Sequence, residues 1–147
     1  MVDTTCIGRA FPPYTADVDV AGLQLFASAT GETRPEYLTE TAAHAAGHPS
    51  LPAPPTYLAC LYARHAGAFG WMRELGIDVA KVLHAAQTFR YFESIHAGDR
   101  LTFVSRIANV LQKKNGTRTF VVKLTDVTNQ HGARVAEMRV TIVVRGA

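Results

Sequence analysis

Three side chains with different chemistry lie within six residues of one another. Glu32 carries a carboxylate, Arg34 a guanidinium and Tyr37 a phenol. A carboxylate can accept a proton at neutral pH, whereas a phenol with a pKa near ~10 is a poor general base and is better suited to donate a hydrogen bond or a proton. Arg34 could contact a phosphate group. The alternative is an ordinary turn with a solvated charge pair.

Two short helices are predicted on either side of this segment. Residues 21–30 place apolar side chains at helical spacing and stop at Gly31, a favoured residue at helix C-termini. A second helix is predicted over residues 35–46, ending at Gly47. Upstream, a short edge strand is predicted over residues 15–20, because Val18 and Val20 would lie on one side and Asp17 and Asp19 on the other.

A long buried helix is predicted downstream. Residues 47–55 contain four prolines and must form a loop, and Pro55 suits the first position of a helix. Over residues 57–75 a stripe of large side chains repeats at steps of three and four, beside a stripe of small ones. Small side chains let a helix approach a sheet closely, so this pattern predicts one helix of about five turns packed on a sheet.

Four strands with a period of two follow, at residues 83–95, 101–111, 117–128 and 134–144. In the third strand an apolar set alternates with a polar set, namely Phe120, Val122 and Leu124 against Thr119, Lys123 and Thr125. One face of an antiparallel meander is buried, and the long helix is the element available to cover it. The fold class predicted for residues 1–147 is α+β, as a single hot-dog domain whose long antiparallel sheet wraps around a central helix.

The segment from Gly31 to Ala43 resembles the signature of the MaoC-like hydratase and dehydratase family. That signature reads Gly-Asp-x-Asn-Pro-x-His, followed after five residues by a small residue. Here Gly31, Pro35 and Ala43 are in register, while Glu32 replaces Asp, Arg34 replaces Asn and Tyr37 replaces His. In the family, the Asp and His of this signature act on an acyl thioester.

Further segments are similar to the N-terminal, FAS1-like dehydratase type of MaoC-like domain. They are residues 53–57, residues 82–87 with the stretch through Phe89 and Tyr91 to residues 97–101, and the closing residues 143–145. The resemblance covers residues 11–145. It implies a protein of the (R)-specific enoyl-CoA hydratase and 3-hydroxyacyl dehydratase class, acting on a thioester of CoA or of acyl carrier protein. Hot-dog proteins commonly pair edge to edge, which implies a dimer.

Two versions of this function are open. In the first, Glu32 and Tyr37 support catalysis in a homodimer. In the second, which the substitutions favour, the chain is the non-catalytic half of a heterodimer and shapes an acyl tunnel while a partner supplies an intact Asp and His. A different class also stays open: a hot-dog thioesterase that uses Glu32 to activate water, or a stand-alone module that binds acyl thioesters.

Four residues are candidates for substrate binding. Arg34 could contact CoA or pantetheine phosphates, and the backbone N–H groups of Thr56 and Tyr57 could stabilise a thioester oxyanion at the start of the long helix. His84 is the fourth, although a lone histidine at a strand start is more often structural. In a regular strand His84 and Gln87 would face opposite sides of the sheet.

Composition excludes several other classes. The chain has 147 residues, two cysteines far apart in the sequence, no signal-peptide pattern and no long apolar span, which predicts a cytoplasmic protein without a membrane segment. Residues 79–147 carry a net charge of +7, but no stacking pattern of aromatic side chains supports nucleic-acid binding. His44 and His48 have the spacing of a metal pair without a third ligand nearby, so neither a metal nor a cofactor is expected.

Overall fold

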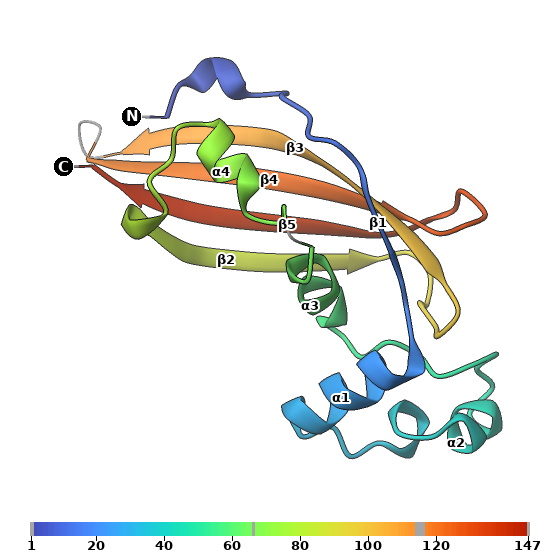
Figure 1. The fold of residues 1–147 in the computed structure, drawn as a ribbon. Coiled ribbons are helices and arrows are strands. Elements are labelled where there is room, and N and C mark those ends of the chain that lie inside the picture. Colours follow the sequence, from blue (N-terminus) through green and yellow to red (C-terminus); the bar gives the residue numbers. More distant parts are fainter. Residues whose placement is uncertain (1, 66, 114–116, 147) are drawn as a thin grey trace.

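The computed structural model describes residues 2–65, 67–113 and 117–146. It contains a five-stranded sheet and four short α-helices (Figure 1). In chain order the elements are β1 (Tyr14–Asp17), α1 (Val20–Thr30), α2 (Glu40–Ala45), α3 (Tyr57–Ala63), α4 (Gly70–Glu74), β2 (Val82–Tyr91), β3 (Arg100–Lys113), β4 (Arg118–Thr128) and β5 (Arg134–Arg145).

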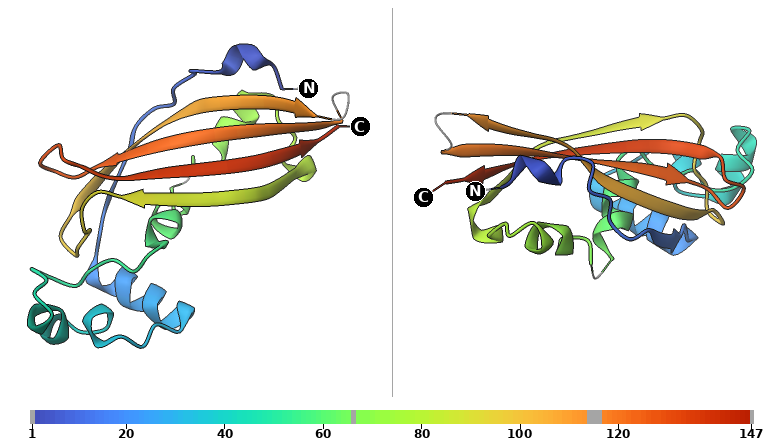
Figure 2. Two further views of the ribbon diagram at one scale, coloured as in Figure 1. Left: turned by 180° about the vertical axis from the view of Figure 1, so that it is seen from behind. Right: turned by 90° about the horizontal axis from the view of Figure 1, so that it is seen from above.

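The sheet has the strand order β1-β3-β4-β5-β2, and all neighbours are antiparallel. Strands β3, β4 and β5 form a meander, but the predicted four-strand meander is wrong in one respect, because β2 does not lie beside β3. Strand β1 lies at one edge, as predicted, but it ends at Asp17, and Asp19 and Val20 are the N-cap and first residue of α1. Within the described part of the chain, β2 pairs only with β5 and forms the other edge. Helices α3 and α4 lie on one face of the sheet, while α1 and α2 lie near one end (Figure 2). The predicted α+β hot-dog class is confirmed.

The prediction of one long helix over residues 57–75 is wrong in one respect, because this segment forms two helices, α3 and α4. The connection contains three-residue turns, in which the N–H groups of His65, Ala68 and Gly70 each donate to the carbonyl three residues earlier. The His65 ring stacks on Tyr14 at 4.1 Å, and a Cβ on Gly67 would lie 2.8 Å from His65 Nε2. Glycines are poor helix formers, so the chain bends here and places an aromatic stack where helix was expected.

The helix predicted over residues 35–46 is divided in a similar way. A 3-10 turn spans Pro35–Tyr37, and α2 begins only after Thr39. The Thr39 hydroxyl accepts a hydrogen bond from Ala42 N at 3.2 Å, which makes Thr39 an N-cap. Helix α1 ends as predicted at Gly31, whose φ of 70° is left-handed.

The buried side chains form two clusters. One lies beneath α1 and α3 and contains Leu23, Tyr57, Leu58, Leu61, Phe103 and Val127 among others. The second lies beneath α4 and contains Trp71, Met72, Ile107, Val121 and Ile142 among others. Buried polar side chains of β3 and β4 accompany them, namely Ser105, Thr119, Lys123 and Thr125.

These polar residues correct the predicted orientation of β4. The face covered by the helices carries Thr119, Val121, Lys123, Thr125 and Val127, and all five are buried. The apolar set of Phe120, Val122 and Leu124 lies on the other face, where Leu124 pairs across the sheet with Arg106 and Arg139. Long arginine side chains can cover an apolar neighbour with their methylene groups, so this face is less polar than a simple alternation implies.

Candidate functional site

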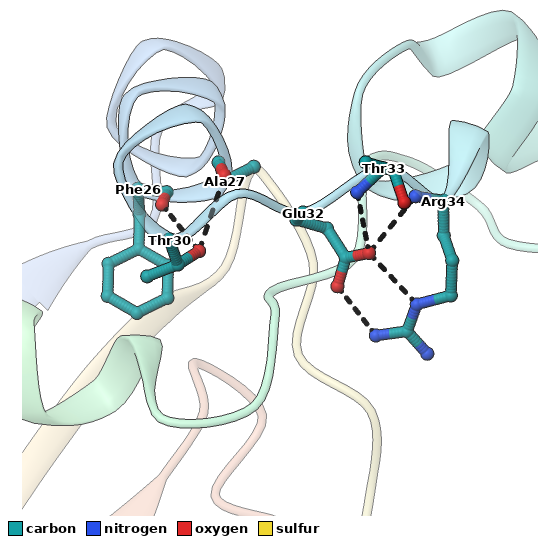
Figure 3. Close-up of polar contacts among 6 residues, drawn as sticks. All are labelled: Phe26, Ala27, Thr30, Glu32, Thr33 and Arg34. Atoms are coloured by element: carbon teal, nitrogen blue, oxygen red, sulfur yellow. Dashed lines mark hydrogen bonds and ion pairs between the residues drawn. The ribbon is translucent and has the colours of Figure 1, made fainter.

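The turn after α1 holds Glu32 and Arg34 in a closed pair (Figure 3). Glu32 Oε1 accepts hydrogen bonds from Thr33 N at 3.0 Å, Arg34 N at 3.0 Å and Arg34 Nε at 3.1 Å, and Oε2 accepts one from Arg34 Nη2 at 2.7 Å. Hydrogen bonds from the Arg34 side chain, and then from its backbone, lower the pKa of Glu32 to about 2. The carboxylate is therefore a weak base at neutral pH.

Tyr37 lies on the other side of Arg34. The Arg34 guanidinium carbon is 4.4 Å from the centre of the Tyr37 ring, so one cation contacts both the carboxylate and the aromatic face. The guanidinium nitrogens Nε and Nη2 are already engaged by Glu32. This arrangement is the solvated turn that the sequence left open as the alternative, and it leaves only part of Arg34 available for a phosphate.

A cavity of about 340 Å³ adjoins Tyr37 and is also lined by His48, Tyr91, Phe92 and Glu93. His48 Nδ1 lies 3.2 Å from His96 Nε2. Burial, followed by the charge of His48, lowers the pKa of His96. Sequence reasoning considered His48 only with His44 as a metal pair, and the approach of His96 had no signal in the sequence. Among the described residues no group of three or more potential ligands could hold a metal ion.

Thr56 and Tyr57 stand at the start of α3. Thr56 has a left-handed φ of 73°, and Tyr57 N donates to Pro54 O at 3.1 Å, so this N–H already has a partner. The Tyr57 side chain is 1% exposed and packs edge-on against Phe26 at 5.5 Å. Tyr57 is therefore a core residue that joins α1 to α3, and its N–H is not free for a thioester oxygen.

His84 lies in a different place, together with Gln87. The β2–β5 register shifts between His84 and Ala86, so that His84 pairs with Ile142 and Gln87 with Val140. Ile142 and Val140 are two residues apart on β5 and share a face, hence this bulge puts His84 and Gln87 on the same side. A regular strand would have separated them, and no feature of the sequence predicts the bulge.

The cavity that both residues line measures about 330 Å³ and lies between α3, α4 and the sheet. Its other lining residues include Tyr62, Trp71, Met72, Lys123, Val140 and Ile142. Lys123 Nζ donates to Tyr62 Oη at 3.0 Å, Tyr62 Oη lies 3.5 Å from Ser105 Oγ, and Ser105 Oγ lies 2.8 Å from Thr125 Oγ1. We call Tyr62, Ser105, Lys123 and Thr125 the polar belt. Sequence reasoning missed it because lysine and threonine on a strand indicate a solvated face.

The site residues predicted from sequence thus fall into three places. Glu32, Arg34 and Tyr37 form one group, Thr56 and Tyr57 belong to the start of α3, and His84 lines the cavity of the polar belt. An antiparallel sheet with helices on one face is the architecture of a hot-dog domain. Residues 5–138 match the family model described as FAS1-like, dehydratase domain region, and the chain belongs to this family.

Two relatives with similar sequences identify a more specific family. A UPF0336 protein of Streptomyces griseus is 35% identical over 147 residues, covering 99% of this chain and 97% of the relative. A UPF0336 protein of Clavibacter michiganensis is 35% identical over 142 residues, covering 95% and 93%. The chain is thus a member of the UPF0336 family.

Solved structures share the fold. The HadBC (3R-hydroxyacyl-ACP dehydratase) complex of Mycobacterium tuberculosis contains a chain with a TM-score of 0.81 and 26% identity, and the match covers 94% of this chain and 96% of that one. A chain of the ChsH1–ChsH2 complex from the same organism has a TM-score of 0.76 at 21% identity, covering 93% and 89%. A MaoC-like dehydratase of Rhodospirillum rubrum has a TM-score of 0.71 at 21% identity, covering 96% and 93%.

Proposed function

We propose that this protein is the non-catalytic, acyl-binding subunit of a heterodimeric hydro-lyase that interconverts 2-enoyl and 3-hydroxyacyl thioesters. The observation that carries the proposal is the closed Glu32–Arg34 pair. At the position where the MaoC-like signature has its aspartate, the carboxylate accepts four hydrogen bonds within its own turn and has a pKa of about 2.

Hydration needs a base with a pKa near neutrality, which activates the water that adds to the β-carbon, and a proton donor for the α-carbon. It also needs hydrogen bonds to the negative charge that develops on the thioester oxygen. Glu32 is poorly matched to the first task, and position 37 carries a phenol in place of the imidazole of the signature. A partner subunit with an intact Asp and His would supply both proton transfers, and these steps require no metal or redox cofactor.

The edge of β2 supports the assembly. In the described residues this edge of the sheet has no strand beside it, and it exposes Leu83, Tyr91 and Phe92, each at more than 40% of its surface. An unpaired edge with apolar side chains is a template for a second sheet. The HadBC and ChsH1–ChsH2 structures are complexes of two different chains, as their names state. We therefore propose that the partner pairs with the sheet at β2.

The substrate is proposed to be a thioester of CoA or of acyl carrier protein. Both carry negative charge, and residues 79–147, which include β2 to β5, have a net charge of +7. Cys6 and Cys60 are free thiols, which accords with a cytoplasmic setting. Within the described residues, no helix is long and apolar enough to cross a membrane.

A self-sufficient hydratase is the second candidate, because His48 and Tyr37 line one cavity. An imidazole there could take the role of the missing signature histidine. The thioesterase alternative has less support, since a carboxylate with a pKa of about 2 activates water poorly.

The test is hydration of crotonyl-CoA and of a longer 2-enoyl-CoA by the purified chain, alone and after co-expression with a hot-dog protein that has the intact Asp-x-Asn-Pro-x-His motif. We expect no turnover by the chain alone and turnover by the complex. Within the complex, Glu32→Ala and Tyr37→Phe should change kcat less than about tenfold. Turnover by the chain alone that His48→Ala abolishes would establish the second candidate and overturn the first.

A further inference from the structure

Lys123 is a buried cation in the middle of the sheet. Its side chain points to the face covered by the helices, and the residue is 3% exposed. The ammonium group donates to Tyr62 Oη at 3.0 Å and lies 4.2 Å from the centre of the Tyr62 ring and 5.1 Å from that of Trp71. Tyr62 therefore provides a hydrogen bond and a cation–π contact, and Trp71 provides a second cation–π contact.

The ammonium group has no anionic partner in the described part of the chain. The ion pairs found there involve only arginines as cations, and none includes Lys123. An ammonium group has three N–H donors, of which the Tyr62 oxygen engages one. A buried charge without a counter-ion is costly, so proteins rarely keep one without a use for it.

A second donor faces the same cavity. Gln87 Nε2 is buried and has no hydrogen-bond partner among the described residues. Gln87 pairs with Val140, and Val140 pairs with Lys123, so the three residues form one row across β2, β5 and β4. Adjacent strands are about 4.8 Å apart, which places the Gln87 and Lys123 Cα atoms about 10 Å from each other on the same face. An acceptor between them would satisfy both donors.

Most of the other residues that line the cavity are apolar, although His84, Tyr62 and Thr125 also line it. Its volume of about 330 Å³ lies at the lower end of the range for small-molecule sites. Phe69 and Val79 line it and are 59% and 52% exposed, whereas Trp71, Met72 and Ile142 are buried. The exposed rim of the cavity therefore includes Phe69 and Val79, together with Ala63 and His84, whereas Lys123 is buried at 3% exposure.

We propose that this cavity binds an acyl chain whose end distal to the thioester carries a carboxylate. The proposal rests on the proposed function, because it assumes that the acyl group enters tail first. An apolar chain would contact Trp71 and Met72, and the carboxylate would accept hydrogen bonds from Lys123 and Gln87. A chain that ends in a methyl group would leave both donors buried and unpaired.

The experiment compares two thioesters of equal chain length, suberyl-CoA with a distal carboxylate and octanoyl-CoA with a distal methyl group. Binding to the purified chain is measured by calorimetry and by the fluorescence of Trp71, which is the only tryptophan and lines the cavity. We expect suberyl-CoA to bind about 10- to 100-fold more tightly, the range of a charge-assisted hydrogen bond.

The variants identify the donors. Lys123→Met should abolish or reverse the preference for suberyl-CoA, and Gln87→Leu should reduce it about three- to tenfold. Lys81→Met is the matched control, since Lys81 is exposed and does not line the cavity. It should leave the preference unchanged.

The outcomes separate this proposal from the proposed function. Equal affinity for the two thioesters, or a preference that survives Lys123→Met, would overturn the distal carboxylate and leave acyl binding intact. Failure of both thioesters to bind would overturn both ideas. Free suberate and octanoate form a further arm. If they bind through Lys123 while neither thioester does, the ligand is a free carboxylic acid and the proposal as stated is wrong.

Discussion

Replacing Lys123 by methionine should make the protein without ligand more stable. Methionine has a similar length and no charge, so the substitution removes a buried ammonium group while it fills the same space between Tyr62 and Trp71. Burial lowers the pKa of Lys123, and the contact with Tyr62 raises it by less. The lowered pKa means that the folded environment, taken as a whole, disfavours the charged form.

The size of the effect follows from opposing contributions. Removing a buried charge relieves a desolvation cost of several kcal/mol. The variant loses one hydrogen bond to Tyr62, worth about 1.5–3 kcal/mol for a charged donor, and two cation–π contacts of about 1 kcal/mol in total. A net gain of about 1–2 kcal/mol is expected, which for a chain of 147 residues raises Tm by about 3–8 °C.

The stability gained by Lys123→Met should decrease as the pH rises. The folded-state pKa of Lys123 lies below its unfolded value near 10.5, so between the two values the unfolded chain binds more protons. The stability of the wild type therefore rises with pH through this interval, whereas the variant lacks the contribution. The advantage of Lys123→Met is full below the folded pKa and disappears as pH passes 10.5.

The assay is urea unfolding of both proteins and of Lys81→Met at several values between pH 6 and about pH 10, with tryptophan fluorescence as the probe. The stability difference between Lys123→Met and wild type should be positive at pH 6 to 7 and shrink toward pH 10, and Lys81→Met should show no such trend. A variant less stable than wild type at neutral pH, or a difference that does not vary with pH, would refute the reasoning.

Three further results are expected. Arg34→Met should raise the pKa of Glu32 from about 2 toward its ordinary value of 4.5, as measured by NMR titration of the carboxyl carbon, because its main hydrogen-bond donor is lost; an unchanged pKa would contradict the closed pair. Gly67→Ala should destabilise the protein by about 1 kcal/mol or more, since its Cβ would meet an imidazole at 2.8 Å, whereas Gly70→Ala, with nothing within 4 Å, should leave thermal stability unchanged or slightly raised. Tyr57→Phe should change the free energy of unfolding by less than about 1 kcal/mol, because the buried hydroxyl has no hydrogen-bond partner in the described residues; a loss of 2 kcal/mol would reveal one.

The presence of the strands and of the helix that follows β1 could be predicted from local patterns, but the position of β2 beside β5 could not. Alternation marks β3 and β5, glycine ends α1, and both signals act over only a few residues. The division of the helix over residues 57–75 could not be predicted in this way. The bend depends on the stacking of His65 on Tyr14, which lies about fifty positions earlier in the sequence. Contacts between distant segments leave no periodic trace in a single sequence.

Only one part of the candidate site, the Glu32 turn, could be predicted from the sequence, and the reason is again the distance between the contributing residues along the chain. The Glu32 turn was found because its residues are adjacent and match a signature, and its closed geometry is set by hydrogen bonds between neighbours. The cavity was not found, because it needs a bulge in β2 to bring His84 beside Gln87 and a lysine that faces inward on β4. A polar residue on the buried face violates the alternation rule, and such violations are expected where function outweighs stability.

The Glu32 turn and the cavity lined by Lys123 and Gln87 differ in whether their polar groups already have partners. In the turn, every Glu32 hydrogen bond comes from the next two residues, so the carboxylate is satisfied without a substrate. In the cavity, Lys123 and Gln87 retain donors that no described residue satisfies. A group that performs acid–base chemistry needs a pKa near neutrality, while a group that selects a substrate needs unsatisfied donors held in place. At its signature position this chain does not have the first property, because hydrogen bonds lower the pKa of Glu32 to about 2, and its sheet carries the second. This combination is what the proposed function requires of a subunit that selects the acyl group while a partner performs the proton transfers.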